Sequence, residues 1–206
     1  MKILPTFQEF MLRNLPVKSQ PLMPKETASL LTPPVVVALA GRRPDAPNAD
    51  SKRFPQSNTP LVRQRLYNLF VSEGFTVLVS SAACGADLLA LSIAIELGMQ
   101  TIVVLPFAPA LFRRLSVTDR PGDWGELFDR VLEQTTKDGT LRVLNYAEDD
   151  PKAFLETNKL IVALAREQAG PDESPVCTLV WDGHPRGEMT QANNLDISAA
   201  KLASGW

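Results

Sequence analysis

Five short apolar runs, each separated from the next by a helical pattern, constrain the fold of this chain most strongly. The runs are VVVALA, FTVLVS, TIVVLPF, LRVLN and VCTLVWD, at 35–40, 75–80, 101–107, 141–145 and 176–182. They are short and rich in β-branched residues, as strands buried on both faces are. Strands of this kind that alternate with helices predict an α/β fold. We expect a doubly wound, mainly parallel sheet of five strands or slightly more, with helices on both faces.

Helix start and stop signals lie between these runs. Thr59 is a candidate N-cap, Gly74 and Gly98 stand just past two predicted helix ends, and Pro151 suits a first helical turn. These signals and the apolar spacing predict helices at 60–74, 86–97, about 125–134, 151–168 and 190–203.

Residues 1–34 differ from the rest because prolines interrupt them repeatedly. They predict an N-terminal extension with a short helix between Phe7 and Leu15, followed by a single domain over 35–206. The extension is either an arm that docks a partner or a second copy of the chain, or a segment that lies on its own domain. A homodimer is compatible with the sequence.

Charge and cysteine usage narrow the class of protein. The formal net charge is −2, which gives no electrostatic reason to expect nucleic acid or a membrane surface as a partner. Cys84 and Cys177 fall in separate apolar segments and are expected to be free buried thiols, which favours a cytoplasmic setting. The single histidine, His184, excludes a histidine-rich metal site, and no metal is expected.

Ligands bind at the carboxyl ends of the strands in an open parallel sheet. The loop SSAACGAD follows the second strand, and its small side chains would let an anion such as phosphate approach the next helix N-terminus. Asp87 either caps this helix or accepts a hydrogen bond from a ribose hydroxyl. Arg42 or Arg43, after the first strand, would clamp the phosphate, or one is solvated while the other pairs with Asp45. The ligand-binding candidates in these two loops are Gly41, Arg42, Arg43, Ser80, Ser81, Gly85 and Asp87.

Two later loops add further candidates. The connection after the third strand, from Pro106 to Trp124, mixes aromatic residues with arginines and is too long for a simple turn. It is either a lid over a base and a phosphate, or a flap packed on itself in which Trp124 anchors the next helix. The ligand-binding candidates in this connection and in the loop after the fifth strand are Phe107, Ser116, Trp124, Asp182, Gly183 and Gly187.

These segments together resemble the Rossmann-like nucleotide-binding superfamily that contains the Smf/DprA proteins, the Lonely guy (LOG) proteins and nucleotide-sensor domains. The resemblance covers about residues 35–203 and is carried by ALAGRRPD, VLVSSAACGADLLALSIAIELG, VVLPF with FRRLSVTDRPGDW, and LVWDGHPRGEMT. It implies a bound nucleotide or nucleotide derivative as ligand, with no cofactor required.

The resemblance departs from the hydrolases of this superfamily at one loop. They carry PGGxGTxxE, whose glutamate works in glycosidic bond cleavage, whereas this chain reads DGHPRGEMTQAN with Asn193 at that place. Asp182, Glu188 and Asp87 remain as candidate catalytic carboxylates. We therefore expect a protein that binds or senses a nucleotide-derived ligand and is not an enzyme. An N-glycosidic hydrolase or transferase of LOG type, and a structural protein-interaction module, stay open as alternatives.

Overall fold

The structure is a computed structural model that describes residues 33–171, 173–180 and 200–202. The unit described begins at Pro34. All but the last two residues of the predicted extension therefore lie outside the described residues, and its arm and dimer interpretations stay predictions.

A parallel sheet forms the centre of this unit. Its order is β4-β3-β2-β1-β5-β6, and every neighbouring pair is parallel. The chain therefore builds outward from β1 to β4 and then crosses back to place β5 on the other side of β1. This reversal confirms the predicted doubly wound α/β fold. The strands are β1 (Val36–Gly41), β2 (Val77–Ser80), β3 (Gln100–Leu105), β4 (Leu141–Val143), β5 (Val176–Val180) and β6 (Ala200–Leu202).

Helices connect the strands and cover both faces of the sheet. A short 3-10 helix (Gln56–Asn58) precedes the first of them. Gly74 ends that first α-helix in the left-handed conformation with φ 66°, as its position in the sequence predicts. The described α-helices are α3 (Thr59–Glu73), α4 (Ala86–Glu96), α5 (Pro109–Ser116), α6 (Trp124–Lys137) and α7 (Ala153–Ala169).

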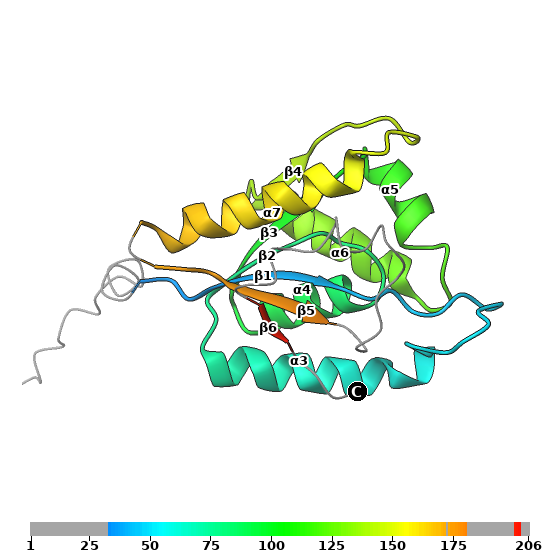
Figure 1. The fold of residues 1–206 in the computed structure, drawn as a ribbon, viewed down its shortest axis with the longest axis horizontal. Coiled ribbons are helices and arrows are strands. Elements are labelled where there is room, and N and C mark those ends of the chain that lie inside the picture. Colours follow the sequence, from blue (N-terminus) through cyan, green and yellow to red (C-terminus); the bar gives the residue numbers. More distant parts are fainter. Residues whose placement is uncertain (1–32, 172, 181–199, 203–206) are drawn as a thin grey trace, which may run out of the picture. The chain divides into compact units, whose positions relative to one another are not determined.

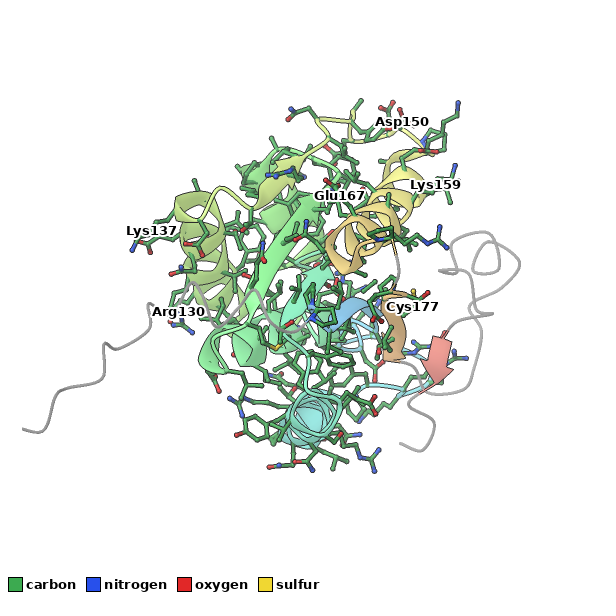
Figure 2. All side chains as sticks on the ribbon, turned by 90° about the vertical axis from the view of Figure 1, so that its left-hand side faces the viewer. Arg130, Lys137, Asp150, Lys159, Glu167 and Cys177 are labelled. Atoms are coloured by element: carbon green, nitrogen blue, oxygen red, sulfur yellow. The ribbon has the colours of Figure 1, made fainter. Side chains whose placement is uncertain are left out.

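Each face of the sheet is covered by its own hydrophobic cluster. The larger cluster joins side chains of α3, α4, α5 and α6 to one face, including Phe70, Leu88 and Phe128. The smaller cluster places Ile161 and Ala165 of α7 against the opposite face. Figure 1 shows α3 and α7 on opposite sides of the sheet, and Figure 2 shows α3 end-on with Lys137 of α6 and Lys159 of α7 pointing away from it.

Two segments differ from the predicted secondary structure. The long connection after β3 contains α5, which begins at Pro109, so it is not a continuous loop. Within the predicted helix 190–203, the residues that the structure describes form β6, which pairs with β5. The sequence pattern missed this strand because three residues are too few to show a period.

None of the helices in the described residues combines the length and the apolar character that crossing a membrane requires. The cytoplasmic setting stays a prediction.

Candidate functional site

An open cavity of about 480 Å³ lies at the carboxyl end of β1, where the order of the strands reverses. Its volume falls within the range of about 300–1,000 Å³ that is common for ligand sites. The wall is contributed by the end of β1, the loop before α4, and the helices α5 and α7. The described lining residues are Leu39, Ala40, Gly41, Arg43, Ser81, Ala83, Asp87, Phe112, Ser116, Phe154, Thr157, Asn158 and Ile161.

This cavity brings together five of the residues predicted from the sequence. They are Gly41, Arg43, Ser81, Asp87 and Ser116, and they come from three different connections. Ser116 is the last residue of α5 and is 3% exposed. The loops after β1, β2 and β3 therefore converge on one site, as the carboxyl ends of neighbouring parallel strands do.

Asp87 in the first turn of α4 is the most unusual side chain in the cavity wall. It is 7% exposed, and its Oδ2 accepts a hydrogen bond from the Ala83 amide at 3.3 Å. Its Oδ1 is buried and has no hydrogen-bond partner among the described residues. Burial raises the pKa of Asp87 to about 7, against the smaller lowering effects of the Ala83 amide, the Arg43 charge and the Gly41 amide. Near neutral pH this carboxyl therefore exchanges a proton within the site.

Arg43 supplies positive charge to the same cavity. Its guanidinium forms an ion pair with Asp119 in the segment after α5, and Arg120 contacts the same carboxylate at 3.3 Å. The Cys84 thiol lies next to Arg43, and burial raises its pKa, so the thiol stays uncharged. Two arginines that share a single carboxylate leave one excess positive charge among these three side chains.

The N-terminus of α4 is partly covered by the chain itself. The Ala86 amide donates to the Arg42 carbonyl at 3.0 Å, and the Cys84 amide donates to the Ser116 carbonyl at 2.9 Å. A Cβ on Gly85 would lie 2.6 Å from the Arg42 oxygen. The close backbone approach predicted at Gly85 is therefore made by the loop after β1. A phosphate was expected at this helix N-terminus, and the Ala86 N–H there is already bonded.

Three other candidates are placed away from the cavity wall. Ser80 is fully buried, and its hydroxyl donates to the Leu39 carbonyl at 3.0 Å, which joins β2 to β1. Phe107 is buried in the larger cluster. Trp124 is 5% exposed and its Nε1 donates to the Pro121 carbonyl at 2.8 Å. This arrangement matches the structural interpretation of Trp124 as an anchor for the next helix.

The first turns of α7 supply cavity residues that the sequence reasoning missed. Phe154 is half-exposed and meets Phe107 edge-to-face, with ring centroids 5.6 Å apart. Thr157 and Asn158 lie one turn further along. The signal present in the sequence was an aromatic residue three positions after Pro151, in the first turn of the predicted helix. Phe154 lies close to β1 because of the order of the strands in the sheet, and a local sequence pattern does not reveal that order.

Several remaining predictions lie outside the described residues. They concern the loop after β5, with Asp182, Gly183, Gly187 and Glu188. Among the described residues, Asp87 is therefore the one catalytic candidate, and no group of acidic, histidine or cysteine side chains in the described part is arranged to hold a metal ion.

No family model and no curated protein matches the chain. Its fold is similar to that of two solved structures. DNA processing protein A from Helicobacter pylori, which binds single-stranded DNA, is 19% identical with a TM-score of 0.44, and the match covers 80% of this chain and 61% of that one. The Moco carrier protein from Chlamydomonas reinhardtii is 17% identical with a TM-score of 0.36, and the match covers 82% of this chain and 89% of that one.

At these identities the likeness concerns the fold alone, and this chain spans 61% of the length of the DNA processing protein that it matches. The parallel sheet and its strand order show the Rossmann-like architecture, and membership of the Smf/DprA superfamily stays a prediction. The narrower resemblance to Lonely guy proteins stays a prediction.

Two predictions from the sequence are contradicted by the first similarity. A small nucleotide ligand was expected, and nucleic acid was not, whereas the matched protein binds single-stranded DNA. The exclusion of nucleic acid was drawn from the net charge of −2. That argument was wrong in principle, because a net charge averages over the whole surface and does not report where the charged side chains lie.

Proposed function

We propose that this chain binds single-stranded nucleic acid at the cavity beside β1. The observation that carries the proposal is the pairing of an exposed aromatic ring with a guanidinium in one open site. Phe154 is 50% exposed and Arg43 lines the same cavity. Unpaired bases stack on aromatic side chains, and arginines bind the backbone phosphates, so this pairing suits an unpaired strand.

Further arginines extend the positive surface beyond the cavity, which favours a strand over a single nucleotide. Arg113 and Arg114 lie on α5, and Arg120 follows in the segment after it. Each pairs with a carboxylate: Arg113 with Asp129, Arg114 with Glu148 and Arg120 with Asp119. Exposed ion pairs of this kind contribute little to stability, so a phosphate can replace the carboxylate at small cost.

Removal of the Phe154 ring tests the proposal. We expect Phe154→Ala to weaken binding of a labelled single-stranded oligonucleotide by roughly five- to 150-fold, as the loss of one stacked base does. Fluorescence anisotropy of the full chain with single-stranded and duplex forms of the same sequence measures this. The single strand should bind more tightly than the duplex, whose bases are not available for stacking.

Val71→Ala is the matched control, because Val71 is 55% exposed on α3, which covers the other face of the sheet. It should leave the affinity unchanged. Equal loss in both variants, or no binding of any single strand at low salt, would refute the proposed function.

We propose in addition that the strand is bound without cleavage. Cleavage of a glycosidic bond generally uses a pair of carboxylates, and Asp87 is the one carboxylate among the described lining residues. Chromatography of the bound oligonucleotide after long incubation should show no released base. Release that is lost in Asp87→Asn would show an enzyme instead.

A further inference from the structure

One carboxylate and two arginines form a cluster beside the cavity. Arg43, which lines the cavity, donates a hydrogen bond to Asp119 in the segment after α5. Arg120 contacts the same carboxylate at 3.3 Å, and both contacts are made to a single oxygen, Oδ2 of Asp119. The loop after β1 and the segment after α5 are therefore joined through one carboxylate.

Solvent reaches the carboxylate of this cluster. The contacts are made by terminal nitrogens, Nη2 of Arg43 and Nη1 of Arg120, and not by the buried Nε atoms of the two arginines. The Asp119 side chain that covers these terminal nitrogens is 29% exposed. A group that arrives from solvent can therefore take the place of the carboxylate once the Asp119 side chain turns away.

A phosphate suits this pair of arginines better than the carboxylate does. Guanidinium groups bind carboxylates and phosphates through the same planar set of donors. A phosphodiester has two non-bridging oxygens, so each arginine could have an oxygen of its own, whereas both share Oδ2 of Asp119. Because the carboxylate belongs to the chain, it competes with every incoming phosphate for the same nitrogens.

We propose that Arg43 and Arg120 form a phosphate-binding subsite for the strand, and that Asp119 occupies this subsite and weakens binding until a phosphate displaces it. The inference rests on the proposed function, because the phosphate arrives as part of a strand. Arg43 lines the same cavity as Phe154, so one strand can stack a base on the ring and place a phosphate at the arginines.

This competition favours a strand over a small anion. A free phosphate would have to break both ion pairs of Asp119 in exchange for one contact. A strand meets the same arginines while its other phosphates and bases are already held, so the contact forms at a high effective concentration. Asp119 therefore raises the affinity that a ligand needs, and a strand meets that requirement through several contacts at once.

Removal of the Asp119 charge tests the inference. We expect Asp119→Asn to bind a labelled oligothymidylate strand roughly two- to 30-fold more tightly than the unmodified chain, because two partly exposed ion pairs no longer compete with the phosphate. Fluorescence anisotropy of the full chain at constant salt measures this. Asp119→Ala should show the same gain, because the gain comes from the lost charge and not from the new amide.

Two further variants locate the effect. In a chain that already carries Arg120→Gln, Asp119→Asn should give a smaller gain, because it then frees Arg43 alone. Glu96→Gln is the matched control, since Glu96 pairs with Arg63 and is the last residue of α4, at the amino end of the strands. It also removes one negative charge and frees one arginine, but it should leave the affinity unchanged.

Equal gains in Asp119→Asn and Glu96→Gln would show a general effect of charge and would overturn the inference. Unchanged or weaker binding in both Asp119 variants would also overturn it and leave single-strand binding intact. An undiminished gain in the Arg120→Gln chain would overturn the role of Arg120. Failure of the unmodified chain and of every variant to bind the strand would instead remove the proposed function itself.

Discussion

At the residue scale, the sequence correctly predicted a close approach at Gly85, but the group that approaches is another segment of the chain and not a ligand. The SSAACGAD loop was read as an opening for a ligand, but a Cβ at Gly85 would meet the Arg42 oxygen at 2.6 Å and the Pro44 Cδ at 2.8 Å. The glycine has φ +94°, which also disfavours other residues. The small residue is required because two segments of the chain touch there.

Gly85→Ala should therefore destabilise the fold, with a free energy of unfolding lowered by about 2–5 kcal/mol from steric overlap and backbone strain together. Gly98→Ala is the control, because Gly98 also has a positive φ but nothing within 4 Å of its added Cβ. That variant should lose only about 1–2 kcal/mol. Urea unfolding of both measures the difference, and equal losses would show that the contact with Arg42 and Pro44 is unimportant.

Helix α5 is the element whose structure changes the interpretation most. Its segment was expected to be a lid or a self-packed flap, and the sequence signal for a helix was Pro109 at the first position. Phe112 is 1% exposed and stacks on Phe128 of α6 with ring centroids 6.1 Å apart. The helix is therefore fixed to the core and is not a loose cover.

Phe112→Ala should release α5 and lower the free energy of unfolding by about 3–5 kcal/mol, the usual cost of removing a buried phenylalanine. Hydrogen exchange should show the amides of Phe112 and Val117, which donate to Ala108 and Arg113 carbonyls, protected in the unmodified chain and faster in the variant. Rapid exchange of these amides in the unmodified chain would restore the lid interpretation.

The strands and most helices could be predicted from the sequence because their signals are local. β-Branched runs marked β1, β2 and β3, and Gly74 marked the end of α3. The site could be predicted only in part. Gly41 ends β1, and Arg43 and Ser81 lie within two residues of a strand end, so the rule for parallel sheets places them together. Phe154 of α7 joins them because the chain crosses back over β1, which depends on contacts between distant residues.

At the scale of the whole molecule, the distribution of charge matters more than its sum. The net charge is −2, yet Arg43, Arg114 and Arg120 all lie in connections at the carboxyl ends of β1 and β3. Asp119 pairs with Arg43 and Arg120, and Glu148 pairs with Arg114, so each of these arginines has a carboxylate neighbour at the same edge. A strand that follows this edge would meet positive charge where its phosphates replace these carboxylates.

The contribution of these arginines to strand binding should be measurable from the salt dependence of the binding constant. The logarithm of the binding constant should fall linearly with the logarithm of salt concentration between about 50 and 200 mM, with a slope of about −0.7 for each neutralised phosphate. Arg114→Gln and Arg120→Gln should each reduce the steepness by about 0.7. Arg130→Gln is the control on the outer side of α6 (Figure 2) and should leave the slope unchanged. Identical slopes in all variants would place the strand elsewhere.

The strand order also has a consequence for synthesis of the chain on the ribosome. Val37 of the central strand β1 pairs with Val176 of β5. Translation proceeds at about 5–20 residues per second. The edge of β1 that pairs with β5 therefore stays unpaired for on the order of ten seconds after β1 has been synthesised. The buried run Val36–Leu39 is apolar, and an unpaired apolar edge recruits other chains. The same reversal of strand order that creates the cavity therefore makes the nascent chain dependent on protection until β5 has been made.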